Sequence, residues 1–441
     1  MVPTHLQDCI ARIQAHSEES SVALTHVENT EQVLAKRSQC ASGSSEHALD
    51  GLVCSIKACI DVQGWVTHAG SKALQDRPAA VADAPVVAAL RAEGALCIAQ
   101  TNMTEFAYGA LGVNEHFGTP CSPLFGSERR VAGGSSSGGA VSVALGFADI
   151  ALGSDTSGSA RIPAAFCGVV GFKPTHARWP LEGFIPLAPS FDTPGILATS
   201  VATCKQVFDA IDATLSRSRA NANSLLATDP SRPFRVRVPT NVLEYCPPDD
   251  PVKRAFVAAL DVLRAEGWLI DESPMPSLDG LGRIAADAGM IAAEAYSVHY
   301  ELLDRAGDRY DPLVRERIEA GKNGPAWRYA AARDALARRA VLYAAELEGY
   351  DAVVCPTTPM LPPTLEQLAD RETYLAQNKR SFAYTELANR LGVPSISVPI
   401  NQSGAAGVGL LLTGKSHLDT DLFYVATALD AALSHAHSKK E

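Results

Sequence analysis

The chain has 441 residues, of which 46% are apolar by the usual count and 20% are charged, and it contains 33 Gly and 27 Pro. This composition excludes a disordered chain, a coiled coil and collagen. The formal net charge of −11 argues against nucleic acid as an obligate partner and against a polybasic membrane anchor. The most apolar stretch, residues 140–152, is interrupted by Asp149, and the N-terminus lacks the basic and apolar regions of a signal peptide. We therefore expect a cytoplasmic protein without a membrane span.

The ten cysteines are scattered along the sequence. The only close pair, Cys54 and Cys59, has four residues between its members and no matching second pair or histidine cluster. Zinc-type spacing is therefore absent, and a reducing cytosol allows such thiols to serve as small buried apolar groups. We expect neither a disulfide nor a metal site.

The elements of the N-terminal part follow from apolar periodicity and from Gly and Pro positions. They are a helical region over 1–36, a loop over 37–50, a buried strand over 52–56, a helix over 84–93 and a strand over 95–99. Asp83 is the expected N-cap of that helix, with Pro85 in its first turn. Residues 107–139 hold eight glycines and little periodicity, and a loop of that length in a compact domain is usually functional.

Short apolar strands and helices alternate over the rest of the chain. The expected helices are 140–147, 201–214, 251–266, 281–305, 326–348, 380–391 and 419–433, and the expected strands are 150–152, 234–238, 352–355, 395–399 and 407–412. This alternation predicts an α/β fold with a mixed, mainly parallel β-sheet core covered by helices. We expect a single large domain over 1–441, with an N-terminal helical region (1–50), a core (51–205), a variable region (206–350) and a C-terminal part of the core (351–441).

Two short motifs in this sequence have a familiar form, and the context argues against both. The segment Gly409–Ser416 fits the phosphate-loop pattern G-x4-G-K-[ST], but the interval Leu-Leu-Leu-Thr prefers a strand to a phosphate-binding loop. Gly134-x-Ser136-x-Gly138 fits the nucleophile elbow of α/β-hydrolases, but none of the later histidines lies in a context that favours it as the base. Taken alone, this run could also be a flexible Gly/Ser loop without chemistry.

A second Gly/Ser segment, residues 153–159, changes this interpretation. Ser159 lies 24 residues after Ser135, and both serines lie in loops that lead into regular structure, where free N–H groups can bind an anion. Upstream, Lys57 ends a buried strand, and burial lowers the proton affinity of a lysine so that it can act as a base near neutral pH. Two serines and one lysine suffice for acyl transfer without histidine.

The stretch Val131–Thr175, VAGGSSSGGAVSVALGFADIALGSDTSGSARIPAAFCGVVGFKPT, closely resembles the signature of the amidase signature family. Further similar segments are 51–62, 70–71, 101–106, 118–120, 191–195 and 407–414. The resemblance covers about residues 51–205 and resumes at about 350–430. The last segment resembles the family's final strand, which accounts for the false phosphate-loop pattern.

The resemblance implies a Ser–cis-Ser–Lys catalytic triad and a role for several neighbours. Ser159 matches the nucleophile, Ser135 the bridging serine after a cis peptide bond from Gly134, and Lys57 the base. The N–H groups of Thr156, Ser157, Gly158 and Ser159 match the oxyanion hole. Residues that match supporting or substrate-binding positions are Asp155 and Arg161, which brace the loop, and Ala107 and Ser136, which we expect to contact substrate.

The resemblance implies hydrolysis of a linear amide to a carboxylic acid and ammonia or an amine through a seryl acyl-enzyme, without metal or cofactor. Since the base must be a neutral lysine, we expect a pH optimum on the alkaline side. Two positions depart from the family: Ala58 and Cys59 replace the usual Asp and Asn after the lysine, and Ser157 replaces a usual Gly. Neither change removes a triad member.

The substrate and assembly remain open at this level. The form of the loops is most similar to small-amide and biuret-type bacterial members, and we expect a small-molecule amide and, from the family, a homodimer. Alternatives are a glutaminase-type subunit of an amidotransferase complex and a catalytically silent member. Arg315 and Arg317 in the variable region could bind a substrate carboxylate or could lie on a solvated helix face.

Overall fold

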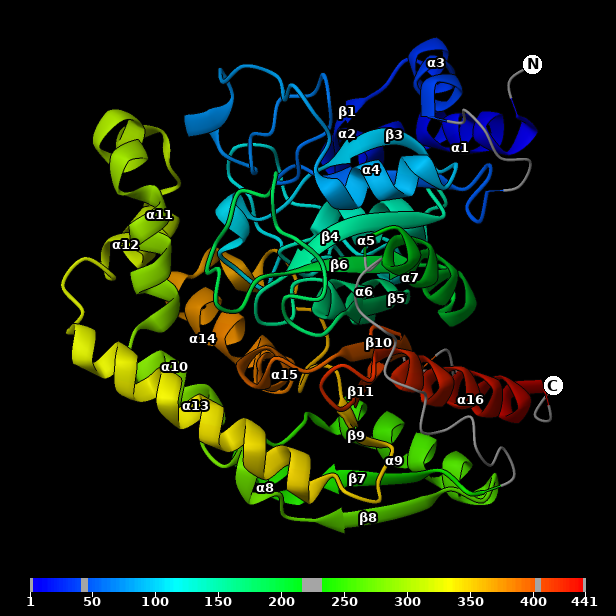
Figure 1. Ribbon diagram of the computed structural model, residues 1–441, viewed down its shortest axis with the longest axis vertical. Coiled ribbons are helices and arrows are strands. Elements are labelled where there is room, and N and C mark those ends of the chain that lie inside the picture. The colour runs from blue at the N-terminus through cyan, green and yellow to red at the C-terminus, as the bar shows by residue number, and fades with distance from the viewer. Residues whose placement is uncertain (1–2, 41–46, 216–231, 401–405, 439–441) are drawn as a thin grey trace.

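The computed structural model describes residues 3–40, 47–215, 232–400 and 406–438. Within these ranges one 11-stranded sheet has the order β1-β3-β2-β4-β6-β5-β10-β11-β9-β7-β8, and helices surround it (Figure 1). The strands are β1 (Leu24–Val27), β2 (Val53–Lys57), β3 (Leu96–Thr101), β4 (Ile150–Asp155), β5 (Val170–Lys173), β6 (Thr193–Ala198), β7 (Arg235–Pro239), β8 (Leu269–Ser273), β9 (Ala352–Pro356), β10 (Ser395–Pro399) and β11 (Gly409–Thr413).

The helices of the first half are α1 (Thr4–Ala15), α2 (Ser17–Ala23), α3 (Thr30–Cys40), α4 (Pro85–Ala92), α5 (Ser137–Ala144), α6 (Arg161–Cys167) and α7 (Val201–Leu215). Those of the second half are α8 (Thr240–Tyr245), α9 (Asp250–Ala265), α10 (Leu281–Asp287), α11 (Met290–Ala306), α12 (Pro312–Glu319), α13 (Ala326–Glu346), α14 (Arg371–Ser381), α15 (Glu386–Leu391) and α16 (Asp419–Ser438).

The sheet is mixed, as the sequence predicts, but the expectation that it is mainly parallel is wrong. Of the ten neighbouring strand pairs in the described chain, six are antiparallel and four are parallel. The parallel pairs are β2–β3, β2–β4, β7–β8 and β7–β9, whereas β4, β6, β5, β10, β11 and β9 alternate in direction. An apolar run shows that a strand is buried but not which way its neighbour runs, so the direction was not readable from the pattern.

Successive residues of the central strands pack into two separate cores. In β4, Ile150 and Leu152 join one apolar cluster while Ala151 joins the other. The first cluster lies under α4, α7, α9 and α16, and the second under α1, α2, α3, α5 and α6. Because strand side chains alternate between the two faces, these strands are apolar throughout rather than alternately polar.

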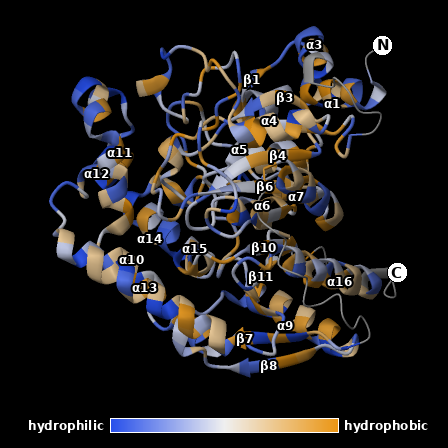
Figure 2. Ribbon diagram, viewed as in Figure 1, coloured by the Kyte–Doolittle hydropathy of each residue, from blue (hydrophilic) through white to orange (hydrophobic). Residues whose placement is uncertain are grey.

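Hydropathy follows this arrangement (Figure 2). The apolar colour gathers on the central strands, and polar residues recur along the outer helix α13. No helix in the described ranges is long and apolar enough to cross a membrane.

Several predicted boundaries differ from the structure for identifiable reasons. The predicted helical region over 1–36 contains the short edge strand β1, which pairs antiparallel with β3. The predicted helix 281–305 is divided into α10 and α11 at Gly289, whose φ of 62° interrupts a right-handed helix. The N-cap of α4 is Ala84 rather than Asp83, whose carboxylate instead accepts from Arg91 at 2.6 Å.

Candidate active site

Lys57 and Ser135 meet beneath the surface of the protein. Lys57 is the last residue of β2, and both side chains are fully buried. Lys57 Nζ lies 2.8 Å from Ser135 Oγ and 2.8 Å from Ser154 Oγ on the neighbouring strand β4. The parallel pairing of β2 with β4 places the lysine beside the serine-containing end of that strand.

Ser135 lies in a tightly packed turn before α5. The peptide bond between Gly134 and Ser135 is cis, as the resemblance implies. A Cβ atom at Gly134 would lie 2.5 Å from the Gly112 nitrogen and 2.8 Å from Thr104 Oγ1, so only glycine fits. The Ser135 carbonyl accepts from the Thr104 N–H at 3.1 Å, which attaches this turn to the segment after β3.

Ser159 lies between β4 and α6 and faces a cavity. Its hydroxyl makes no hydrogen bond with another described residue, and its carbonyl accepts from the Ser136 N–H at 3.1 Å. Ser136 itself is placed differently from our expectation of a substrate contact. It is fully buried, is not among the residues that line this cavity, and donates its hydroxyl to the Ser154 carbonyl at 3.3 Å.

The surroundings of Lys57 favour its neutral form. Burial lowers the pKa of Lys57, and the more distant charges of Asp155 and Asp192 oppose this effect only in part. Ala58 leaves no carboxylate directly after the lysine, and Cys59 places its Sγ 3.8 Å from Ser154 Oγ. Burial also raises the pKa of the Cys59 thiol, so this group is neutral near the lysine.

Asp155 and Arg161 form a fully buried bidentate ion pair at the base of the loop that carries Ser159. Arg161 Nε and Nη2 lie 3.0 and 2.9 Å from the two carboxylate oxygens. Burial alone would raise the pKa of Asp155, but the Arg161 guanidinium and further donors hold it well below its usual range. The same carboxylate accepts from the N–H groups of Gly158 and Ala160 at 2.8 and 3.1 Å, which fixes the course of the loop.

The outward carbonyl groups of this loop are bound by α15 and its N-terminal flank. Asn389 Nδ2 donates to the Asp155 carbonyl at 3.2 Å, Arg390 Nη1 lies 3.5 Å from the Thr156 carbonyl, and Thr385 Oγ1 donates to the Ser157 carbonyl at 2.7 Å. Since C=O and N–H point in opposite directions in a trans peptide, holding these carbonyls outward turns the linked N–H groups inward.

The inward N–H groups are those that the resemblance assigns to an oxyanion hole. Within the described residues, the N–H groups of Thr156, Ser157 and Ser159 donate to no protein acceptor. Gly158 differs, because its N–H donates to Asp155. This arrangement leaves three N–H groups beside Ser159 that can bind an anion.

The cavity in front of Ser159 has a volume of about 230 Å³. Ala107, which the sequence places at the substrate, lies in its wall, with φ of 60°. The other lining residues are Tyr108, Gly109, Thr156, Ser157, Ser159, Leu187, Ala285, Ala286, Gly289, Met290, Ile291, Ala292, Arg317, Phe382, Glu386 and Arg390. Such a volume fits a small molecule.

Arg317 and Arg315 occupy different environments. Arg317 lines the cavity, donates Nη1 to the Tyr108 carbonyl at 2.6 Å and stacks over the Tyr108 ring at 4.0 Å. No carboxylate of the described residues pairs with it. Arg315 is half-exposed and pairs with Glu319 at 2.8 Å, so only the first of these arginines is placed to meet a ligand.

Sequence reasoning missed Ser154 and the contributions of α15. Ser154 belongs to the Gly/Ser segment 153–159, and its position on the strand next to Lys57 was the available signal. Thr385, Asn389 and Arg390 lie more than 220 residues after the loop that they bind, and their sequence context gives no comparable signal.

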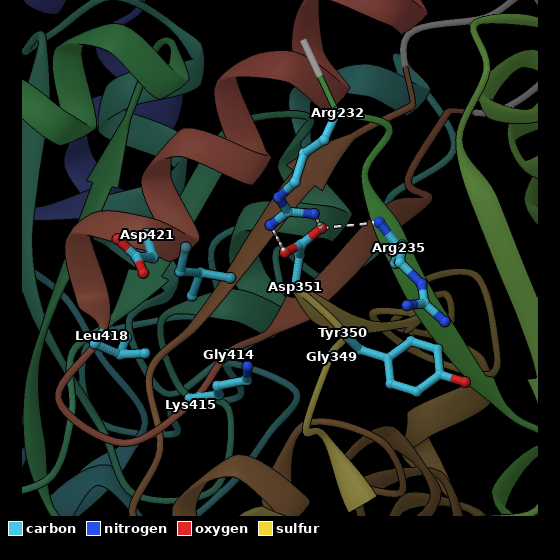
Figure 3. A pocket seen from close by; sticks show the side chains of 10 residues that line it. Arg232, Arg235, Gly349, Tyr350, Asp351, Gly414, Lys415, Leu418 and Asp421 are labelled. Carbon is cyan, nitrogen blue, oxygen red and sulfur yellow. Dashed lines mark hydrogen bonds and ion pairs between the residues drawn. The ribbon is translucent and has the colours of Figure 1, made fainter. Parts of the chain in front are cut away.

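The Gly409–Ser416 segment is a strand and a turn, as expected. β11 occupies Gly409–Thr413, and Gly414 and Lys415 line a separate cavity of about 380 Å³ (Figure 3). There the guanidinium of Arg232 faces the carboxylate of Asp351, with Nη2 2.5 Å from Oδ1. Among the described residues no group of three or more His, Cys, Asp and Glu side chains is arranged to hold a metal ion.

Comparison with known proteins agrees with this geometry. A family model described as Amidase matches residues 5–423. A 2-amino-5-chloromuconic acid deaminase from Comamonas testosteroni is 33% identical over 395 residues, which cover 88% of this chain and 83% of the relative. A glutamyl-tRNA(Gln) amidotransferase subunit from Halobacterium salinarum is 32% identical, with 88% and 97% covered. A crystal structure of an amidase superposes with a TM-score of 0.82 at 30% identity and covers 97% of this chain and 95% of its own.

Proposed function

The chain belongs to the amidase family, and from this premise we propose that it hydrolyses the carbon–nitrogen bond of a small linear amide through a seryl acyl-enzyme. The observation that carries the proposal is the 2.8 Å contact between Lys57 Nζ and Ser135 Oγ in a buried position that favours neutral lysine. We assign Ser159 as the nucleophile, Ser135 as the bridging serine and Lys57 as the base.

The reaction then proceeds in two halves. Neutral Lys57 takes a proton by way of Ser135 while Ser159 attacks the amide carbon, and the N–H groups of Thr156, Ser157 and Ser159 bind the oxyanion. Lys57 and Ser135 return the proton to the leaving nitrogen. Water then attacks the acyl-enzyme by the same route and releases the carboxylic acid, which regenerates the Ser159 hydroxyl.

We further propose that the acyl part of the substrate carries a carboxylate that binds Arg317. This guanidinium lines the cavity without a carboxylate partner among the described residues, whereas Arg390 in the same wall pairs with Glu386 at 3.1 Å. A guanidinium that keeps free donors suits bidentate binding of a carboxylate. The name of the Comamonas relative, a deaminase of a muconic acid, fits an acidic substrate.

The test is ammonia release from a panel of acetamide, benzamide, malonamide, glutamine, indoleacetamide, biuret and succinamate. We expect wild-type activity toward at least one compound and a loss of at least about a thousandfold in Ser159→Ala. Ser416→Ala, at an exposed serine, is the matched control. Equal activity in wild type and Ser159→Ala would contradict the proposal. If both are silent, intact mass after treatment with a fluorophosphonate separates a reactive Ser159 from a catalytically silent member of the family.

A glutaminase-type subunit is the second candidate, because the Halobacterium relative is a subunit of an amidotransferase and matches almost over its whole length. This candidate predicts low glutaminase activity alone and co-purification with other chains. The expected homodimer and cytoplasmic location stay predictions, and light scattering after size-exclusion chromatography tests the first.

A further inference from the structure

Ser157 and Arg390 are in contact in the wall of the cavity. Arg390 Nη2 lies 3.1 Å from Ser157 Oγ, and both residues line the space in front of Ser159. Ser157 stands where the resembling family usually has glycine, so this contact requires a side chain that such relatives lack. The pair therefore gives this chain a polar feature of its own beside the nucleophile.

The guanidinium is held firmly by its neighbours. Arg390 is only 7% exposed, stacks over the Phe191 ring at 4.5 Å and shares Nη2 with Glu386 Oε2 at 3.1 Å. The direction of its donor toward Ser157 is thus fixed by packing and by an ion pair. A guanidinium has donors and no acceptor, so in this contact the Ser157 oxygen accepts.

The Ser157 hydroxyl proton is consequently directed elsewhere. No described residue accepts a hydrogen bond from Ser157 Oγ, and the side chain borders the cavity. A hydroxyl that accepts from a cation is also a better donor, because hydrogen bonds in a chain polarise one another. The cavity wall thus presents one oriented O–H donor in addition to the N–H groups of the loop.

We propose that Ser157, positioned by Arg390, selects amides that carry a hydrogen-bond-accepting oxygen on the carbon next to the scissile carbonyl. The position follows from the residue itself: if the Ser157 N–H binds the oxyanion, its own hydroxyl reaches the adjacent substituent. This inference rests on the proposed function. It assigns Ser157 to substrate contact through its side chain, and Arg390 is a positioning residue that acts through Ser157.

The test compares kcat/KM for glycolamide and for propionamide, in which a methyl group replaces the hydroxyl. We expect wild type to prefer glycolamide about tenfold, as one additional satisfied hydrogen bond allows, and Ser157→Ala and Ser157→Gly to lose this preference. The ratio is taken within one variant, so changes in the folded fraction or in overall loop geometry cancel.

The role of Arg390 is tested by the double variant Arg390→Met with Glu386→Gln, which removes both members of the buried pair and leaves no lone charge. We expect the preference for glycolamide to fall at least threefold, whereas Ser416→Ala keeps the wild-type ratio. An unchanged ratio in the Ser157 variants, or wild-type activity toward other amides without preference for glycolamide, would overturn this inference. Silence of wild type toward the whole panel would contradict the proposed function instead.

Discussion

Lys57 Nζ and Ser154 Oγ are 2.8 Å apart, the same distance that separates the lysine from Ser135. A neutral amine has two N–H donors and one lone pair. If Ser154 accepts one N–H, the lone pair is free to face the hydroxyl proton of Ser135. The residue on β4 therefore orients the amine for proton transfer, although it has no part in the covalent chemistry that we propose.

The first expectation concerns the pH dependence of the wild-type enzyme. Burial lowers the pKa of Lys57 from its ordinary value of about 10.5, so the base becomes active below that pH. Because the neutral form is required, kcat/KM should rise with pH through the pKa of this lysine and reach its maximum on the alkaline side. A pH profile of kcat/KM measures this, and a maximum near pH 5 with a fall at higher pH would contradict the assignment of Lys57 as base.

Replacing Ser154 by alanine should lower the plateau of kcat/KM about tenfold. The protonated lysine also loses a hydrogen-bond acceptor, which destabilises the charged form, so the rising limb of the pH profile should move to lower pH. Ser55→Ala is the matched control, since Ser55 is a buried serine of β2 whose hydroxyl pairs with Ser142 at 2.8 Å away from the lysine. If Ser154→Ala shows the wild-type plateau and limb, the orienting role is wrong.

The buried pair of Arg161 and Asp155 should dominate the stability of the loop. Arg161→Met leaves a buried carboxylate without its cation and should lower the free energy of unfolding by about 3–5 kcal/mol, with loss of activity. Urea unfolding followed by fluorescence measures the change. Arg264→Met, at an exposed arginine that pairs with Asp261 and Glu272, should cost less than about 1 kcal/mol. Equal effects of the two substitutions would show that the buried pair has no special weight.

Sequence patterns predicted well those elements that depend on local apolar runs. The strand 395–399 and the helices near 201–214, 251–266 and 326–348 are confirmed almost to the residue, because their burial is visible in the sequence itself. The short strands β1 and β8 and the seven-residue helix α6 were missed, since a few residues carry too little periodicity. The direction of neighbouring strands depends on connections across the whole chain, and the sequence pattern did not contain it.

The candidate site divides in the same way. Lys57, Ser135 and Ser159 stand in recognisable local segments, whereas the residues that shape their surroundings come from distant parts of the chain. The bonds from Thr385, Asn389 and Arg390 to the loop around Ser157 form only after the sheet brings β4 and α15 together. Ser136 illustrates the opposite case, because its neighbours in sequence suggested a substrate contact and its hydroxyl instead binds the Ser154 carbonyl.

Arg317 should determine the affinity for acidic amides. We expect Arg317→Met to raise KM for succinamate about 10- to 100-fold, as the loss of a charge-assisted hydrogen bond requires. KM for 4-methylpentanamide, in which an isopropyl group replaces the carboxylate, should change little. Arg315→Met is the control, because that side chain pairs with Glu319 outside the cavity. Equal changes in KM for both amides would argue against a carboxylate site at Arg317.

Glu105 should make the protein less stable as the pH rises toward neutrality. Burial raises the pKa of this carboxyl to about 7, and its oxygens contact His116 Nε2 at 3.1 Å and the Asp311 N–H at 2.8 Å. Burial lowers the pKa of His116, so the pair is best described as a protonated carboxyl that donates to a neutral imidazole. Between about pH 4.5 and 7 the folded state holds a proton that the unfolded state has lost, so the free energy of unfolding falls with rising pH.

The substitution Glu105→Gln keeps the shape and the donor but cannot ionise. Relative to wild type, this variant should therefore gain stability at pH 8 compared with pH 4.5, on the order of 2–3 kcal/mol. Urea unfolding at the two pH values measures the difference, and Glu115→Gln, at an exposed neighbour, controls for the change in net charge. If the stability difference between Glu105→Gln and wild type is the same at both pH values, Glu105 does not titrate in this range in the folded protein, and the carboxyl that lies behind the Ser135 turn is ionised throughout.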